Sequence, residues 1–145
     1  MKLVDANVLI AAAGRDHPHH ATAAAWLHVA RTMSERLGLC SLVAMAFVRI
    51  TTHRKIHARP LSAAQAIDWL RVLANSPAAQ WVHPGDDHLG HLHKLLSDSD
   101  LAGNVVNDAH LAALAIEHGA SVVSFDRDFL RFAGLRLELL GNPNQ

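Results

Sequence analysis

The stretch Ser121-Val122-Val123-Ser124-Phe125-Asp126 decides the fold. Its apolar run predicts a strand over residues 121–125, and an aspartate follows that strand directly. The N-terminal stretch Lys2-Leu3-Val4-Asp5 repeats the arrangement, because a short apolar run again ends on an acid. Two such strands predict a sheet with acidic groups at the ends of its strands.

Helical patterns separate the predicted strands. Apolar spacing predicts helices from His19 to Leu37 with Gly38 as the C-terminal cap, from Leu42 to Thr51, from Ser62 to near Ser76, after Asp86 or Asp87, and from near Asn107 to Gly119. Further strands are expected at Leu39–Cys40, Trp81–Val82 and Leu135–Leu140. Strands joined by helices of this length require parallel crossovers, so we expect an α/β fold whose parallel sheet is covered on both faces.

The composition fits one compact unit. The chain has 145 residues, half of them hydrophobic, which is enough for one core, so we expect a single domain over residues 1–145. No apolar run approaches the roughly 20 residues that span a bilayer. Cys40 is the only cysteine, which excludes a disulfide framework. We therefore expect a cytoplasmic protein without a membrane segment.

Charge is balanced overall but uneven along the chain. The 13 basic and 13 acidic residues cancel, so the total charge does not indicate a polyanionic partner. No Asp or Glu occurs between Glu35 and Asp68, and that stretch contains Arg36, Arg49, Arg54, Lys55 and Arg59. A cationic face of this kind attracts phosphates even on a neutral protein, although a solvated loop is the simpler interpretation of the charges alone.

Three acids stand out by their context. Asp5 and Asp126 each follow a strand, and Asp108 lies near a helix N-terminus. In parallel sheets ligands collect at the carboxyl ends of strands, where clustered carboxylates repel one another unless a cation is shared. Mg²⁺ prefers oxygen ligands of this type. Each acid taken alone fits a helix cap or a turn, and only the set predicts a metal site.

Three blocks resemble the conserved blocks of VapC-type PIN domains, in the same order. They are Asp5-Ala6-Asn7-Val8-Leu9, Asn107-Asp108-Ala109-His110-Leu111-Ala112-Ala113-Leu114-Ala115 and Ser124-Phe125-Asp126-Arg127-Asp128-Phe129. The resemblance covers nearly the whole chain, and three blocks in the right context are far more specific than one.

The resemblance implies a three-layer α/β/α sandwich and a toxin that is a magnesium- or manganese-dependent endoribonuclease. It also implies a VapB-like antitoxin that occupies the site, and a homodimer. Matched residue by residue, the metal-binding acids are Asp5, Asp108 and Asp126 with Asp128 beside them, Asn7 supports the first acid, and Arg49 is the arginine after the second acidic block. We expect Arg49, Arg54 or Lys55 to hold the RNA backbone.

The chain departs from the family at the second acidic block. The family has a glutamate three residues before the arginine, and this chain has Ala46 three residues before Arg49. A methyl group cannot bind a cation, so we expect impaired catalysis. Deliberate disarming of a toxin and natural loss both explain the alanine, and we favour the first because the other blocks are intact.

Other features have simpler interpretations. The histidine groups near residues 17–20 and 88–93 lack a convincing set of zinc ligands, so we expect surface histidines there and a structural role for His110. Trp26 and Trp69 lie on apolar stripes, which favours packing over base stacking.

Two other functions remain open at this point. An aspartyl phosphatase also has an acid after its first strand, but that class requires a second Asp where this chain has Asn7. The second is a catalytically inactive module that binds RNA or an antitoxin through the cationic stretch, an alternative that Ala46 supports.

Overall fold

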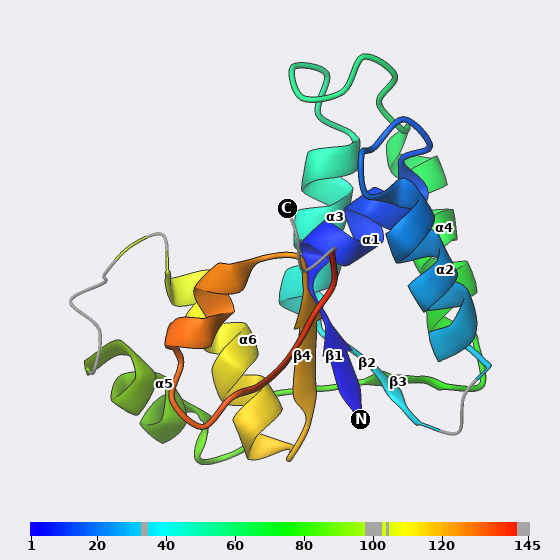
Figure 1. The fold of residues 1–145 in the computed structure, drawn as a ribbon. Coiled ribbons are helices and arrows are strands. Elements are labelled where there is room, and N and C mark those ends of the chain that lie inside the picture. The colour runs from blue at the N-terminus through cyan, green and yellow to red at the C-terminus, as the bar shows by residue number, and fades with distance from the viewer. Residues whose placement is uncertain (33–34, 98–102, 104, 142–145) are drawn as a thin grey trace.

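The computed structural model describes residues 1–32, 35–97, 103 and 105–141. Its strands form a parallel sheet in the order β3-β2-β1-β4-β5 (Figure 1). The strands are β1 (Lys2–Val4), β2 (Leu37–Leu39), β3 (Ala79–Trp81), β4 (Ser121–Ser124) and β5 (Arg136–Leu139). The predicted parallel α/β fold is confirmed, and β1, the first strand in the sequence, lies in the middle of the sheet.

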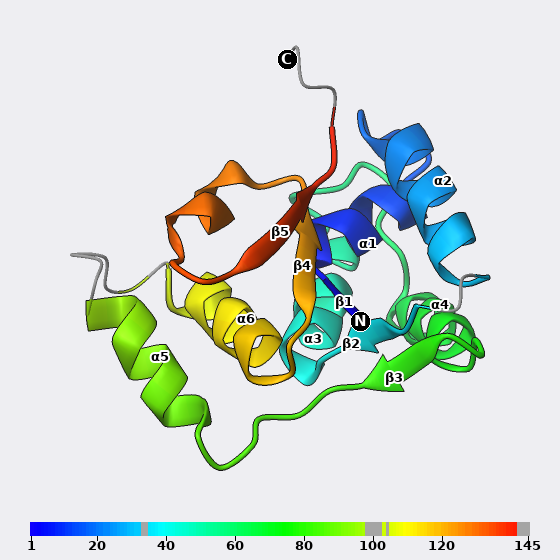
Figure 2. The same cartoon turned by 60° about the horizontal axis from the view of Figure 1, so that its bottom comes forward.

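Helices cover both faces of the sheet. They are α1 (Ala6–Ala13), α2 (His20–Ala30), α3 (Ser41–Thr51), α4 (Ala63–Ala74), α5 (His88–Ser97), α6 (Val106–Glu117) and the 3₁₀ helix η1 (Arg127–Arg131). Helices α1 to α4 lie on one face, where α1 packs against α2 and α3, and α3 against α4. Helices α5 and α6 pack together on the other face with η1 (Figure 2). The result is the expected three-layer sandwich.

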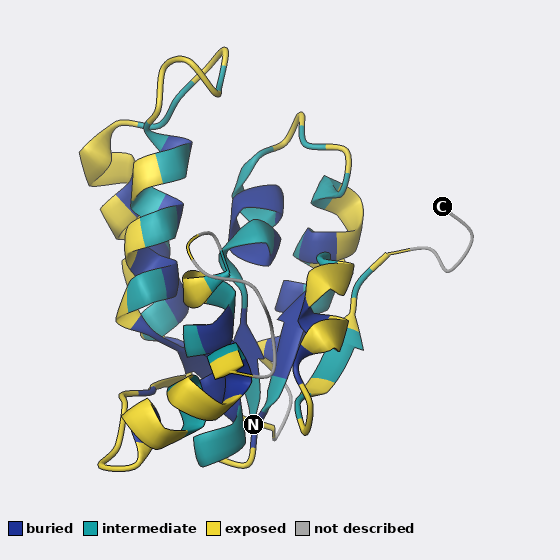
Figure 3. Ribbon diagram, turned by 90° about the vertical axis from the view of Figure 1, so that its left-hand side faces the viewer, coloured by how far each residue is buried: buried dark blue, intermediate teal, exposed yellow. Residues whose placement is uncertain are grey.

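The core lies between the sheet and these two helical layers. Buried residues line the strands and the helix faces that cover them (Figure 3). Leu3, Val122 and Val123 are fully buried, as expected for strands with helices on both sides. Helix α6 contributes the run Ala112–Ala115 without exposed side chains, and its small residues let the helix pack closely on β1 and β4.

One predicted helix was wrong at its C-terminal end. Helix α2 ends at Ala30, whereas we predicted a helix to Leu37, and Met33 lies outside the described residues. Leu37 and Gly38 belong to β2, so Gly38 is not a helix cap. A Cβ at Gly38 would come within 3.0 Å of Leu3 Cδ1 and 3.2 Å of Val82 Cγ2, so the glycine is needed because the neighbouring side chains come so close.

The remaining boundaries differ by one or two residues. The third strand is Ala79–Trp81 instead of Trp81–Val82, and the last is Arg136–Leu139 within the predicted Leu135–Leu140. Ser62 opens α4 with a capping box, in which its side chain accepts a hydrogen bond from Gln65 N. No helix among the described residues is long and apolar enough to cross a membrane.

Candidate active site

Asp5 and Asp126 lie side by side at the carboxyl edge of the sheet. Strands β1 and β4 are parallel neighbours with Val4 opposite Val123, so the residues after them emerge together. Asp5 N donates to Val123 O at 3.0 Å, and the Asp5 side chain makes no capping hydrogen bond to α1. The Asp5 carboxylate instead accepts a hydrogen bond from the Ser124 side chain at this edge.

Ser124 connects the two strand ends through its side chain. The residue is fully buried, and its hydroxyl donates to Asp5 Oδ2 at 2.6 Å. Ser124 Oγ in turn accepts hydrogen bonds from Asn7 Nδ2 and from Asp126 N, both at 2.9 Å. Asn7 Oδ1 also accepts from Phe125 N at 3.3 Å. Asn7 thus supports Asp5 through Ser124.

Ser124 was missed as a site residue in the sequence. Ser124 lies in an apolar strand, where a serine is an ordinary residue, so the local sequence alone does not indicate a functional role. The usable signal was its environment: a small polar side chain at a buried strand end, two residues before an acid. A buried hydroxyl needs partners, and the nearest candidates were the polar groups at the end of β1.

Asp108 is electrostatically coupled to the acids at this edge. It lies in the first turn of α6, and its pKa is raised from 3.8 to about 6. Burial is the largest cause, followed by the negative charges of Asp5 and Asp126, while Arg131 partly opposes them. The three acids that are distant in sequence therefore share one electrostatic environment.

Asp5 has a raised pKa for related reasons. Burial is the main cause, and the hydrogen bond from Ser124 lowers the pKa in opposition. The charge of Asp126 raises it further. Carboxylates that repel one another in this way form a donor set whose chemistry fits a hard divalent cation.

The acids are not already grouped as a complete set of metal ligands. Within the described residues, no three His, Cys, Asp or Glu side chains are arranged so that they could hold a metal ion. Asp128, the fourth candidate, is exposed and its Oδ2 lies 2.9 Å from Arg131 Nη2. The carboxylates are suitable ligands for a cation, but their side chains are not close enough together to form a metal site in this conformation.

Ala46 and Arg49 lie on α3, the helix that begins near the acidic edge. Asp5 contributes to the raised pKa of the Cys40 thiol, which places the start of α3 near Asp5. Ala46 is partly buried and supplies no donor, and Arg49 is exposed. Arg54 and Lys55 are exposed on the loop after α3, and neither they nor Arg49 form an ion pair within the described part of the chain.

The prediction of surface histidines was wrong for His88. This residue is 5% exposed, and its Nδ1 lies 3.2 Å from Glu117 Oε2. Its Nε2 lies 2.9 Å from His110 Nδ1, so the side chain links α5 to α6. His88 shares the apolar stripe of Leu92 and Leu95 at helical spacing, and that register was the available signal for burial.

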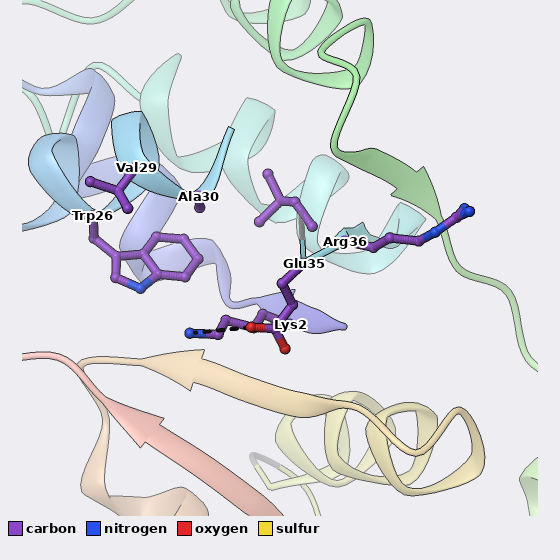
Figure 4. A pocket seen from close by; sticks show the side chains of 7 residues that line it. Lys2, Trp26, Val29, Ala30, Glu35 and Arg36 are labelled. Carbon is purple, nitrogen blue, oxygen red and sulfur yellow. Dashed lines mark ion pairs between the residues drawn. The ribbon is translucent and has the colours of Figure 1, made fainter. Parts of the chain in front are cut away.

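A pocket at the opposite end of the sheet has a different character. Lys2, Trp26, Glu35 and Arg36 line it, together with apolar residues of α2 (Figure 4). Lys2 and Leu37 begin their strands, so this pocket lies at the amino edge, away from the acids. Its charged groups have partners: Lys2 Nζ lies 3.7 Å from Glu35 Oε2, and Arg36 Nη1 donates to Gln80 Oε1 at 2.9 Å.

Comparison with known proteins identifies the family. The PIN domain family matches residues 2–135. Ribonuclease VapC37 of Mycobacterium tuberculosis is 43% identical over 140 residues, covering 94% of each chain. Ribonuclease VapC31 of the same organism is 39% identical over 136 residues, covering 94% of this chain and 96% of the relative.

Solved structures agree in fold. A chain of VapBC2 from Rickettsia felis, crystallised with a DNA fragment from its promoter, matches with a TM-score of 0.72 at 17% identity, over 97% of this chain and 98% of that one. Mycobacterium tuberculosis VapC20, a sarcin-ricin loop cleaving toxin, matches with a TM-score of 0.66 at 19% identity, over 94% and 99%. At such identities the likeness concerns the fold, and the family follows from the sequence matches. The chain belongs to the PIN domain family and, within it, to the VapC ribonucleases.

Proposed function

We propose that the chain is a single PIN domain that acts as a metal-dependent endoribonuclease toxin, impaired by Ala46. The observation that carries the proposal is the coupling of Asp108 to Asp5 and Asp126 at the carboxyl edge of the sheet. Relatives about 40% identical over nearly the whole chain are named ribonucleases, which supports the same reaction class.

Asp5, Asp108 and Asp126 would hold Mg²⁺ or Mn²⁺, with Asp128 as an adjunct once it is released from Arg131. A bound divalent ion of this kind lowers the pKa of a coordinated water and offsets charge on a phosphate. The acids contribute negative oxygens whose mutual repulsion the cation relieves.

The other residues of the edge would position the acids and the substrate. The Ser124 hydroxyl fixes the orientation of Asp5 through its 2.6 Å hydrogen bond, and Asn7 holds Ser124 in turn. Arg49, Arg54 and Lys55 supply exposed positive charge for the RNA backbone. In this proposal the basic side chains bind and orient the RNA, and the acids hold the metal ion that supports cleavage.

Ala46 accounts for the expected defect. A glutamate at this position of α3 would add the carboxylate that the family pattern has and that this chain lacks. Changes to groups that merely support a metal site commonly cost about 10- to 100-fold in affinity or activity, and a missing ligand should cost at least as much.

A VapB-like antitoxin is the proposed protein partner. The fold match to a chain of VapBC2 from Rickettsia felis supports a partner of this kind. We propose that the antitoxin covers the acidic edge, that the toxin forms a homodimer, and that both act in the cytoplasm, where the RNA substrate lies.

The test is restoration of the missing carboxylate. Ala46→Glu should raise magnesium-dependent RNA cleavage at least 10-fold, measured on a panel of structured RNAs. Ala46→Gln is the matched control, because it adds nearly the same volume without the charge and should remain at the level of the starting chain. Equal, negligible cleavage by the glutamate and glutamine forms across the panel would contradict the proposal.

The second candidate is an inactive module that binds RNA or antitoxin. Ala46 and the lack of a preformed metal set among the described residues favour it. The two candidates differ in their response to magnesium: an inactive module binds RNA equally with and without the ion, whereas an impaired nuclease still takes it up weakly through its acids. Calorimetric titration of the starting chain with Mg²⁺ separates them.

A further inference from the structure

Three aromatic rings stand in series beside the acidic edge. The His19 ring stacks on Phe125 with centroids 4.5 Å apart and planes 19° apart. His17 lies against His19 at 5.8 Å and 45°. Phe125 immediately precedes Asp126, so the series begins one residue from a candidate metal ligand.

These rings are not part of the buried core. His17, His19 and Phe125 are all only partly buried, and Phe125 packs against the edge of the core. A core position would favour an aliphatic side chain at 19, because burying an imidazole requires hydrogen-bond partners for its nitrogens. His19 stacked on Phe125, with His17 tilted against it, instead leaves a partly exposed aromatic surface.

The cationic loop after α3 lies next to this surface. His57 contributes to the lowered pKa of His17, after burial and His19 as larger causes, so the loop that holds His57 is close to the ring series. The lowered pKa favours the uncharged ring at neutral pH. His57 Nε2 is buried without a hydrogen-bond partner in the described structure. The same loop holds Arg54 and Lys55, both exposed.

This combination fits single-stranded nucleic acid. Partly exposed rings next to positive charges are the features with which proteins hold unpaired nucleotides: bases stack on aromatic rings and phosphates contact the cations. A metal site made of histidines is the other occupant to consider. Within the described residues no three candidate ligands are grouped to hold an ion, so stacking is favoured.

We propose that His19 and Phe125 form a stacking platform for an unpaired base of the RNA, in a nucleotide that flanks the phosphate to be cleaved. The inference rests on the proposed ribonuclease function and adds to it a subsite for the substrate. Phe125 immediately precedes Asp126, so a base stacked on this platform would belong to the nucleotide next to the phosphate held by the acids.

The first experiment measures binding without cleavage. The starting chain, which has Ala46, is titrated into single-stranded RNA octamers containing 2-aminopurine, whose fluorescence is quenched on stacking. His19→Ala should weaken binding about 5- to 100-fold and reduce the quenching. His19→Phe should retain both, because it keeps a stacking ring without ring nitrogens. His28→Ala is the matched control, since His28 is exposed near the other end of α2.

Two binding outcomes would overturn the platform. The first is unchanged binding and quenching in His19→Ala. The second is a loss of binding and quenching in His19→Phe that is as large as in His19→Ala, because that result assigns the role to the imidazole nitrogens. If added zinc then strengthens RNA binding by the starting chain but not by His19→Phe, the role belongs to a metal ion. Phe125→Leu guards against misfolding of the His19 variants, since it keeps an apolar side chain and should also reduce quenching.

The second experiment separates this inference from the proposed function. In the Ala46→Glu background, His19→Ala should raise KM for RNA about 5- to 100-fold with a smaller change in kcat. A glutamate form that cleaves RNA with the same KM with or without His19 overturns the platform and leaves the nuclease intact. A glutamate form that cleaves no RNA refutes the nuclease, and the quenching assay then decides the platform alone.

Discussion

The two ends of the same sheet treat charge in opposite ways. At the carboxyl edge, burial and the negative charges of Asp5 and Asp126 raise the pKa of Asp108 to about 6. At the amino edge, Lys2 Nζ lies 2.5 Å from Glu138 Oε2, and the N-terminal amine lies 3.3 Å from Glu35 Oε1. Glu138 Oε1 also accepts a hydrogen bond from Trp26 Nε1 at 2.7 Å. One edge concentrates a single sign of charge, and the other pairs opposite signs.

This difference in charge pairing marks the carboxyl edge as a candidate functional site and the amino edge as a structural network. The hydrogen bond from Lys2 to Glu138 raises the pKa of the lysine, so the pair favours the folded state at neutral pH and loses its contribution as pH rises through the raised pKa, above 10.5. At the acidic edge the charged forms are disfavoured instead. A fold keeps repelling carboxylates where something else is to be bound, which is the usual signature of an active site.

The largest effect should come from Ser124→Ala. Removing the hydroxyl leaves Asn7 Nδ2 and Asp126 N without their acceptor in a buried position, so the free energy of unfolding should fall by roughly 2–4 kcal/mol. In the Ala46→Glu background, cleavage should also fall about 10- to 100-fold because Asp5 loses its orientation. Urea unfolding and RNA cleavage measure the two effects.

Ser121→Ala, at the start of the same strand, is the control for Ser124→Ala. Its side chain makes no hydrogen bond within the described residues, so stability should change by about 0.5 kcal/mol or less. Equal effects of the two substitutions on cleavage would refute the special role of Ser124.

Glu138→Ala should have an intermediate effect, limited to stability. It leaves the Trp26 indole without its acceptor and the Lys2 amine with only the 3.7 Å contact to Glu35, at an expected cost of about 1–3 kcal/mol. RNA cleavage in the Ala46→Glu background should not change, because the Glu138 carboxylate is paired with Lys2 and Trp26 and makes no contact with the acids among the described residues. Thermal unfolding checks the first expectation, and a parallel loss of cleavage at a temperature where the variant is folded would break the separation between the edges.

Asp108→Asn should have the smallest effect and the opposite sign. Because the pKa of Asp108 is raised from 3.8 to about 6 in the folded chain, the fold loses stability as pH rises from about 4 to about 6, and the full loss is present above pH 6. At pH 8 and without metal, the asparagine should therefore stabilise the chain by roughly 1–2 kcal/mol, less than the full shift implies because solvent screens a partly exposed group. The gain should disappear below about pH 3, where Asp108 is protonated in both the folded and the unfolded chain, and a gain that is independent of pH would contradict this assignment.

The sequence predicted the sheet well because strands depend on local pattern, and the same pattern predicts the acids as candidate site residues. The apolar runs before Asp5 and Asp126 are short and end abruptly, and a parallel sheet then brings their ends together. The helix that holds Asp108 was equally clear from its alanine and leucine spacing. Together, these predicted elements place the three acids at one edge of the sheet.

The errors arose where one residue fits two patterns or depends on a distant neighbour. Leu37 continues the apolar stripe of α2 and also fits a strand, and only its pairing with Lys2 and Ala79 decides between them. His88 and Ser124 are buried polar residues whose partners, Glu117 and Asp5, are 29 and 119 positions away. Contacts over such separations are tertiary, so local spacing does not contain them.

Calorimetric titration of the Ala46→Glu form with Mn²⁺ tests most directly whether the three aspartates act on one ion. The account predicts saturable uptake that weakens at least 10-fold in Asp5→Asn and in Asp108→Asn, while Glu138→Ala binds as the parent does. Uptake that is equal in all four proteins would mean that these acids do not share a cation, and the active-site assignment would be wrong.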